Sequence, residues 1–383
     1  MSYLRKKNNY RIRLVYFEHS PTMGGAERYL ISLLNGLSPD NYDIVCICTN
    51  ASILEQLKRQ INTNEVHFVF YEMSQPSIWK TVWPLSRLIA SMKPDIVHCN
   101  GIDGYGHSSY FILASRLARV PVVMGIFHTP MMQYPKHTLT EKLFGYLIDQ
   151  LIDAGILISK NSLEPVLNGR HLKSTCLHQI YNGVPIQEFT RASESRTNPI
   201  VIGTVTRLVE CKDVATFLTA ASIVIHQMNY VRFVIFGDGP EKKVLIEQAD
   251  RLGITGNVIF AGWQEDVKSA LQSVDIFVLN SINEGFGLAI VEAMACELPV
   301  IATRVGGIPE IVEEGMTGLL VPPQDPNALA EAICYLIERP QLVRSFGVKG
   351  RQRAQTLFSA DTMVKQTSLL YQKLLSHKIR FLK

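Results

Sequence analysis

Short runs rich in Val and Ile alternate along this chain with helix-length amphipathic segments. Such alternation is typical of β-α-β units, in which successive strands form a parallel sheet and helices cover its faces. The pattern runs through both halves of the chain, so it predicts an α/β protein with two doubly wound, Rossmann-like domains. The predicted strands are residues 12–17, 43–48, 66–70, 96–99, 122–126 and 155–158 in the first half, and 200–205, 232–236, 258–260, 276–279, 300–302 and 318–321 in the second.

Length and composition agree with two domains. The chain has 383 residues, of which 47% are hydrophobic and 19% charged, enough apolar material for two buried parallel sheets. Turn-forming residues at 181–185 and 191–199 mark a linker between the halves. We therefore predict an N-terminal domain over residues 1–190 and a C-terminal domain over residues 191–361. The final segment carries an apolar face that needs a partner, formed by Val364, Leu370, Tyr371, Leu374 and Leu375.

Membrane-spanning, secreted and disulfide-rich proteins are disfavoured. No apolar stretch approaches the roughly 20 residues of a spanning helix, and the basic N-terminus leads into a short strand-like run rather than a signal sequence. The seven cysteines are scattered and form no C-x-x-C pair. We expect a cytoplasmic protein with no nucleic-acid partner. Its net charge is +4, and both ends of the chain are basic.

The most informative motif is the segment Glu284–Glu292, which follows a predicted strand and opens a helix. Gly285 and Gly287 let the backbone approach a ligand closely, and a helix N-terminus attracts a diphosphate. Glu284 can accept hydrogen bonds from sugar hydroxyls, and Glu292 from a ribose. An ordinary strand-to-helix turn is the alternative.

Two cations support this interpretation. Arg207 and Lys212 follow another strand of the same domain and can bind a diphosphate and stabilise the charge that develops as a sugar leaves. The chain contains no Asp-x-Asp pair of the kind that holds a divalent metal on a nucleotide sugar. We therefore expect neither a metal nor a cofactor, although a plain surface pair is as consistent with these two residues alone.

The first half offers two weaker signals. Gly24 and Gly25 follow the first strand and begin a helix, which predicts a phosphate-facing loop rather than a dinucleotide fingerprint. His128 follows a buried strand, and this position favours a functional role over the structural role of most lone histidines.

Together these motifs resemble the retaining glycosyltransferases of family 4, which have the GT-B fold of two Rossmann-like domains facing across a cleft. The matching motifs occur in the family's order over nearly the whole chain: Gly24 to Glu27, His128, Asn182 to Val184, Arg207 with Lys212, Gly237 to Pro240, Glu284 with Glu292, and Gly306 to Glu310. The resemblance implies a nucleotide-sugar donor on the C-terminal domain, an acceptor on the N-terminal domain, and metal-free transfer with retention. It also implies that the last helix, about residues 362–383, packs back on the N-terminal domain.

The resemblance also implies a role for each matching residue. Gly24 and Gly25 face the donor phosphates, Arg207 and Lys212 bind them, Glu284 contacts the donor sugar and His128 lies near the reacting sugar. The remaining donor-binding residues are Gly285, Phe286, Gly287 and Leu288 through the backbone, Glu292 for the ribose, and Trp263 with Gln264 for the base. One departure is Thr206, where the family often has Gly, together with Cys211 before the lysine; we expect only a local adjustment.

The expected function is transfer of a sugar, as a hexosyltransferase, from a UDP- or GDP-sugar in polysaccharide, lipopolysaccharide or glycolipid synthesis. A non-catalytic nucleotide-sugar-binding regulatory protein and a GT-B epimerase are the alternatives. A helix face with Trp79, Lys80, Trp83 and Arg87 leaves open a lipid-linked acceptor and peripheral contact with the inner membrane surface, or else simple packing on the protein's own sheet.

Overall fold

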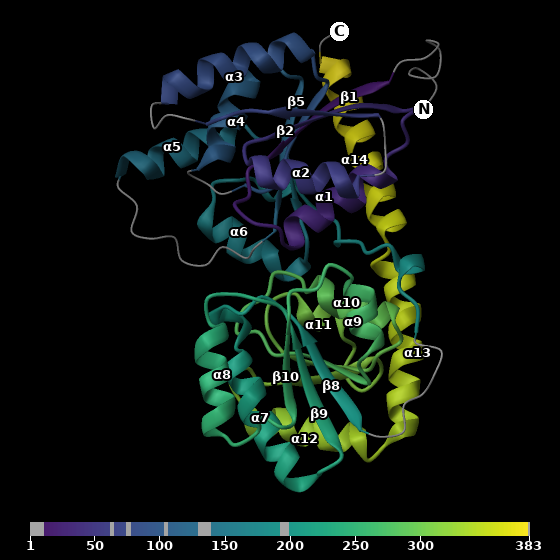
Figure 1. The fold of residues 1–383 in the computed structure, drawn as a ribbon. Helices are drawn as coiled ribbons and strands as arrows, with labels where there is room; N and C mark the ends of the chain where they lie inside the picture. The colour runs from purple at the N-terminus through teal and green to yellow at the C-terminus, as the bar shows by residue number, and fades with distance from the viewer. Residues whose placement is uncertain are drawn as a thin grey trace. The chain divides into compact units, whose positions relative to one another are not determined.

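The structure is a computed structural model that describes residues 11–61, 65–73, 78–102, 106–128, 139–191 and 199–381. Part of the predicted linker, 192–198, lies outside these ranges. The described chain divides into two compact units, residues 1–183 with 360–383 and residues 184–359 (Figure 1). The sequence analysis placed the division between residues 190 and 191.

The first unit is a parallel sheet of seven strands in the order β3-β2-β1-β4-β5-β6-β7. Its strands are β1 (Ile12–Glu18), β2 (Tyr42–Cys48), β3 (Val66–Phe70), β4 (Ile96–Cys99), β5 (Val122–Phe127), β6 (Ala154–Leu157) and β7 (Leu177–Gln179). Its helices are α1 (Gly25–Gly36), α2 (Ala51–Gln60), α3 (Ile78–Met92), α4 (His107–Leu117), α5 (Leu139–Gln150), α6 (Leu163–Gly169) and α14 (Ala360–Phe381). Helices α3, α4 and α5 pack in one layer, while α14 packs beside α1.

The apolar face of α14 finds the partner that it requires in the first unit, where the helix packs beside α1. Val364, Leu370 and Tyr371 are buried in this unit. The helix approaches α1 closely at Gly36, because a Cβ there would lie 2.5 Å from Val364 Cγ2. Buried hydroxyls add polar contacts: Tyr371 bonds both Tyr16 and His98 Nδ1.

The second unit is a parallel sheet of six strands in the order β10-β9-β8-β11-β12-β13. Its strands are β8 (Ile200–Val205), β9 (Val231–Phe236), β10 (Val258–Gly262), β11 (Ile276–Leu279), β12 (Val300–Thr303) and β13 (Gly318–Val321). Its helices are α7 (Val214–Gln227), α8 (Lys242–Arg251), α9 (Val267–Gln272), α10 (Leu288–Ala295), α11 (Ile308–Ile311), α12 (Pro326–Ile337) and α13 (Pro340–Leu357). Helix α7 packs between α8 and α12, whereas α10 packs on α9 and α13.

Both sheets confirm the predicted α/β fold of two doubly wound domains. Every predicted strand is present, with ends that differ by at most two residues. Strand β7 was missed, because its three half-buried residues, Leu-His-Gln, show neither an apolar run nor a clear alternation. In each sheet the strand order reverses beside one central strand, β1 in the first unit and β8 in the second. Open α/β sheets bind ligands at the carboxyl ends of strands at such a reversal.

Candidate active site in two sheet edges

The carboxyl ends of β8 and β11 bring together the two predicted donor loops of the second unit. Lys212 ends a short 3-10 turn after β8, and Glu284 lies between β11 and α10. The Lys212 ammonium forms an ion pair with Glu284 Oε2, and both side chains are largely buried, at 16% and 15% exposure. The structure therefore joins two residues that lie 72 positions apart in the sequence.

Backbone contacts hold these two loops in register. Ile282 N donates to the Cys211 carbonyl at 2.9 Å, and the Asn280 side chain donates to the Asp213 carbonyl. Asp213 takes a left-handed conformation (φ 47°) and caps α7 through Thr216 N at 3.3 Å. Cys211, one of the two residues that depart from the family pattern, thus takes part in the backbone contacts between the loops.

Glycines on both sides allow close packing of the loops. A Cβ at Gly237 would lie 1.8 Å from the Thr206 carbonyl oxygen, and one at Gly306 would lie 1.8 Å from the Glu284 carbonyl oxygen. Gly307 N donates to the same Glu284 carbonyl at 3.2 Å. The Gly-rich segments after β9 and β12 therefore shape the loops that carry Arg207 and Glu284.

The other predicted donor residues of the second unit lie at the same edge of the sheet or next to it. Arg207, two residues beyond β8, is exposed, whereas Gly285, Phe286 and Gly287 are buried. Gly287 (φ 106°) precedes α10, Leu288 begins it, and Glu292 is buried within it. Trp263, which is 54% exposed, and Gln264 follow the edge strand β10, which β9 separates from β8. Within the described ranges, neither Trp263 nor Gln264 forms a hydrogen bond with the ion pair of Lys212 and Glu284.

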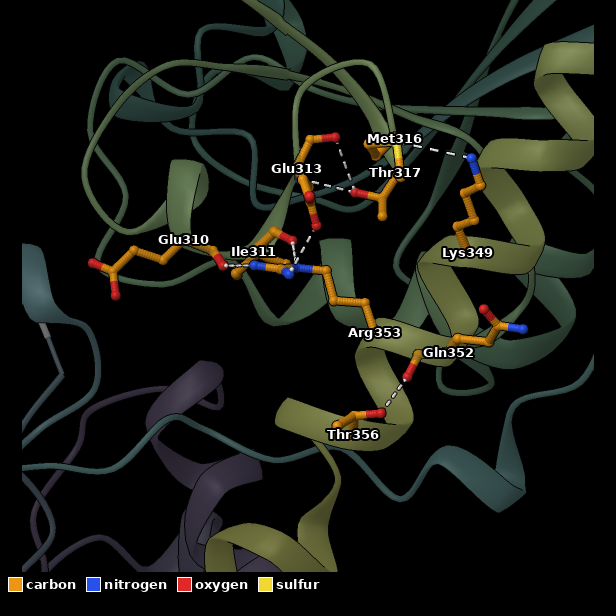
Figure 2. A network of polar contacts seen from close by, with 9 residues as sticks. All are labelled: Glu310, Ile311, Glu313, Met316, Thr317, Lys349, Gln352, Arg353 and Thr356. Carbon is orange, nitrogen blue, oxygen red and sulfur yellow. Dashed lines mark hydrogen bonds and ion pairs between the residues drawn. The ribbon is translucent and has the colours of Figure 1, made fainter.

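Helix α11 is fixed by an arginine from α13, as Figure 2 shows. Arg353 donates to the Ile311 carbonyl at 2.8 Å and to the Glu310 carbonyl at 2.9 Å, and its guanidinium pairs with Glu313 at 3.1 Å. These contacts satisfy carbonyls at the end of the short helix that follows Gly306 and Gly307. The arginine thus holds the segment after β12, whose Gly307 N donates to the Glu284 carbonyl.

The predicted residues of the first unit lie at the carboxyl edge of its sheet. Gly24 caps α1 and Gly25 begins it. His128 follows β5, and its Nε2 lies 3.0 Å from Asn100 Oδ1, just beyond β4. Burial, followed by the neighbouring His19, lowers the pKa of His128 to about 3. His128 therefore remains neutral at physiological pH.

Two buried side chains at this edge were missed by the sequence analysis. Glu18 ends β1 and accepts a hydrogen bond from Asn100 Nδ2, which also donates to the Ala26 carbonyl at 3.1 Å. Burial, reinforced by Glu18, raises the pKa of Glu27. Their position in the sequence offered one indication of a functional role: like His128, Glu18 and Asn100 are polar residues at the end of a buried strand.

Two further properties concern metals and membranes. Within the described ranges, no group of three or more His, Cys, Asp or Glu side chains is arranged to hold a metal ion. None of the helices in those ranges combines the length and apolar character that crossing a bilayer demands.

Two family models match successive parts of the chain. The model described as Glycosyltransferase Family 4 matches residues 23–188, and the model described as Glycosyl transferases group 1 matches residues 185–353. The chain belongs to glycosyltransferase family 4. The resemblance seen in the motifs is thereby confirmed for the family.

Relatives of this family 4 chain differ in how much they align. N-acetyl-alpha-D-glucosaminyl L-malate synthase of Bacillus anthracis is 35% identical over 144 residues, which are 38% of each protein. The chain thus spans well under half the length of that relative. The UDP-Gal:alpha-D-GlcNAc-diphosphoundecaprenol alpha-1,3-galactosyltransferase of Escherichia coli is 25% identical over 357 residues, 86% of this chain and 88% of that protein.

Solved structures show the same fold for this family 4 chain. HepE of Anabaena in complex with UDP superimposes with a TM-score of 0.80 and 23% identity, over 94% of this chain and 100% of HepE. Sucrose-phosphate synthase of Thermosynechococcus elongatus gives a TM-score of 0.78 and 20% identity over 96% of this chain and all of that protein. The fold is GT-B.

Proposed function

We propose that this chain is a retaining, metal-independent glycosyltransferase that moves a hexose from a nucleoside-diphosphate sugar to an acceptor in polysaccharide or glycolipid synthesis. The observation that carries the proposal is the ion pair between Lys212 and Glu284, which sets a cation and a carboxylate side by side at the reversal point of the second sheet. The cation can form a charged hydrogen bond with a diphosphate, and the carboxylate can accept hydrogen bonds from the hydroxyls of a sugar.

The proposed donor site has further positive potential. Arg207 lies on the same loop as Lys212 and is exposed, so its guanidinium is accessible to a diphosphate. The first residues of α10 contribute backbone N–H groups with partial positive charge, in a loop that Gly285 and Gly287 keep free of bulky side chains. We assign the ribose to Glu292 and the base to the neighbourhood of Trp263 and Gln264.

In the proposed reaction, the bond between the anomeric carbon and the phosphate oxygen breaks while the acceptor oxygen forms a bond on the same face. The bonding electron pair leaves with the diphosphate, which also takes the proton of the acceptor hydroxyl, and Arg207, Lys212 and the start of α10 stabilise the negative charge that develops on it. Because these groups replace a divalent cation, we expect turnover to persist after treatment with EDTA. We assign His128 to the vicinity of the reacting sugar and Gly24 with Gly25 to the donor phosphates, and we assign no covalent nucleophile.

The donor nucleotide is the first quantity to measure. A structural neighbour, HepE, holds UDP, and the Escherichia coli relative is named for a UDP-galactose donor, so uridine is favoured over guanosine. A ligand that binds only the folded state at 100 times its Kd stabilises that state by about 2.7 kcal/mol. A thermal-shift screen of UDP, GDP and their sugars is therefore expected to give one clear upward shift of Tm.

Turnover separates the proposal from a non-catalytic binding protein. With the donor found in the screen and a set of glycan acceptors, we expect release of free nucleoside diphosphate. We expect Lys212→Ala and Glu284→Ala to lower the rate about a hundredfold or more, since each removes a charged contact to the reacting ligand. Lys349→Ala, at an exposed lysine of α13, is the matched control and is expected to retain full activity. Binding without release would identify the regulatory alternative, and normal turnover in both site variants would refute the donor-site assignment.

We further propose a lipid-linked acceptor and peripheral contact with the membrane. Trp79 and Trp83 of α3 are 68% and 51% exposed, and the Arg87 guanidinium lies 5.4 Å from the centre of the Trp83 ring. The opposite face of α3 is buried through Val82, Leu85 and Ile89. Aromatic and basic side chains on one exposed face suit the interface of an anionic membrane. The wild-type chain is expected to float with anionic vesicles at low salt. The double variant Trp79→Ser and Trp83→Ser is expected not to float. A wild-type chain that stays unbound would refute this proposal.

A further inference from the structure

Three polar side chains meet at the carboxyl edge of the first sheet in a fixed order. Glu18 ends β1, Asn100 follows β4, and His128 follows β5. The Asn100 side chain lies between the other two: its Nδ2 donates to Glu18 Oε2, and its Oδ1 lies 3.0 Å from His128 Nε2. Glu18 and Asn100 lie outside the motifs that carry the family resemblance, and the reaction described above does not use them.

The orientation of the Asn100 amide follows from its neighbours. Its nitrogen faces an oxygen of Glu18 and the Ala26 carbonyl, 3.1 Å away, and a backbone carbonyl has no hydrogen to donate. Rotating the amide by half a turn would place the Asn100 oxygen against both of them. The Asn100 oxygen must therefore face His128.

This orientation determines the tautomer of the histidine. Because Asn100 Oδ1 is only an acceptor, His128 Nε2 must carry a hydrogen and donate it. Burial keeps the imidazole neutral by lowering its pKa to about 3, so Nδ1 holds the lone pair. His128 Nδ1 is itself buried, and no described residue donates a hydrogen bond to it. An unsatisfied buried acceptor costs about 1–3 kcal/mol, so this nitrogen is suited to receive a hydrogen bond from a ligand.

We propose that Glu18 and Asn100 are positioning residues that hold His128 as its Nε2–H tautomer, so that Nδ1 accepts a hydrogen bond from a sugar hydroxyl during transfer. Glu18 orients the Asn100 amide, the amide sets which nitrogen of His128 carries the hydrogen, and His128 contacts the sugar. In assigning the ligand as a sugar, this inference rests on the proposed function. The tautomer itself depends only on the contacts of this unit.

The substitution Glu18→Gln tests the chain of contacts with almost no change of shape. Ser20 N donates to Glu18 Oε1 at 2.6 Å, so the oxygen of the new amide must stay there and its NH2 group must face Asn100. Two NH2 groups cannot bond each other. Asn100 therefore turns its oxygen toward the new amide at the expense of the Ala26 bond, and its NH2 group then faces His128 Nε2, which must accept.

The measurement is the nitrogen NMR spectrum of the histidine side chains in the full chain at pH 7. We expect the wild type to show His128 as Nε2–H and Glu18→Gln to show it as Nδ1–H. Glu27→Gln is the matched control, because Glu27 is a second buried carboxyl at this edge and, within the described ranges, the Asn100 side chain bonds Glu18, the Ala26 carbonyl and His128 rather than Glu27. It is expected to leave the tautomer unchanged. His98, which bonds Tyr371 instead, serves as an internal reference.

Kinetics provide the second readout. Glu18→Gln is expected to lower kcat/KM about tenfold to a hundredfold, because Nδ1 then carries the hydrogen and cannot accept one from the sugar, while the Kd for nucleoside diphosphate is unchanged. Should Glu18→Gln fail to fold, Asn100→Ala replaces it, and we expect that variant to give a mixture of both tautomers.

The inference would be overturned if His128 of the wild type were the Nδ1–H tautomer. It would also be overturned if neither Glu18→Gln nor Asn100→Ala changed the tautomer. The spectra need no turnover. A chain with the expected tautomers but without transfer would therefore refute the proposed function and leave the assignment of the tautomer standing.

Discussion

At the residue scale, glycine conformation decides where the Glu284 backbone lies. Gly306 adopts a left-handed conformation (φ 52°), and its missing side chain leaves room for the Glu284 carbonyl oxygen. Gly315 has a similar conformation (φ 70°), but nothing lies within 4 Å of a Cβ placed there. A side chain added at Gly315 would therefore only strain the backbone, whereas one added at Gly306 would strain the backbone and also displace the Glu284 carbonyl.

We expect Gly306→Ala and Gly315→Ala to share a strain of about 1 kcal/mol, because both place a side chain at positive φ. Only Gly306→Ala also forces the Glu284 backbone to move, and it is expected to weaken donor binding about tenfold or more. Thermal unfolding and donor titration measure the two effects separately. Equal donor affinity in both variants would show that Gly306 does not set the position of Glu284.

The sequence made some of these residues predictable and others not. That Lys212 and Glu284 lie close together could be predicted, because each follows a clear strand of the same predicted sheet. Glu18 and Asn100 each stand at the end of a buried strand, as His128 does, but that position alone does not show that the two side chains meet. Their role arises from strands β1 and β4 becoming neighbours, which depends on the order of the sheet rather than on nearby sequence.

At the element scale, short helices depend on contacts from outside themselves. Helix α11 has four residues and cannot be stable alone. Its last carbonyls receive hydrogen bonds from Arg353 of α13, as described for Figure 2. The arginine therefore stabilises the helix that follows Gly306.

Arg353→Met is expected to destabilise the second unit by about 2 kcal/mol, because it leaves two carbonyls without their charged donor and removes the pair with Glu313. The free energy of unfolding in urea measures this loss. Lys349→Ala on the same helix is the control, with an expected change within about 0.5 kcal/mol. If both variants unfold at the same urea concentration, the arginine contributes nothing to the unit.

Element boundaries were predictable where apolar runs are clear and the strand is buried. Strands β1, β5 and β11 are buried along most of their length and were located to within a residue. Strand β7 belongs to the edge of its sheet, where pairing on one side is enough and the sequence carries little pattern.

At the scale of the whole molecule, the chain passes between its units twice. Val184 and Ser359, the first and last residues of the second unit, form an isolated parallel bridge, and Val184 N donates to the Phe358 carbonyl at 2.9 Å. The Phe358 ring contacts Phe286, in the loop before α10, edge to face. The sequence located one passage by its turn residues. The second was implied only by the family resemblance, because a helix does not reveal from its own sequence which domain it covers.

Acid is expected to destabilise the first unit. Burial lowers the pKa of both His98 and His128 to about 3, below the value of about 6.5 in an unfolded chain. Between these values the unfolded chain binds protons that the folded unit does not, so the free energy of unfolding falls as pH falls. Each histidine contributes a slope of up to about 1.4 kcal/mol per pH unit.

Urea unfolding at pH 7 and pH 5 tests this dependence. His98→Gln removes one titrating group, and its stability is expected to fall less between the two pH values than that of the wild type. The raised pKa of Glu27 acts in the opposite direction, but it is common to both proteins. An identical loss in the two proteins would mean that His98 does not titrate as its burial requires.

Recognition of a diphosphate by the second unit is tested most directly by comparing two ligands in two proteins. The Kd of the nucleoside diphosphate and the Kd of the matching nucleoside are measured for the wild type and for Lys212→Ala. Loss of one charged hydrogen bond costs about 1.5–3 kcal/mol, so the diphosphate is expected to bind about ten to a hundred times more weakly to Lys212→Ala, with no change for the nucleoside. Equal losses for both ligands, or no loss for either, would contradict a diphosphate site at Lys212 and Glu284.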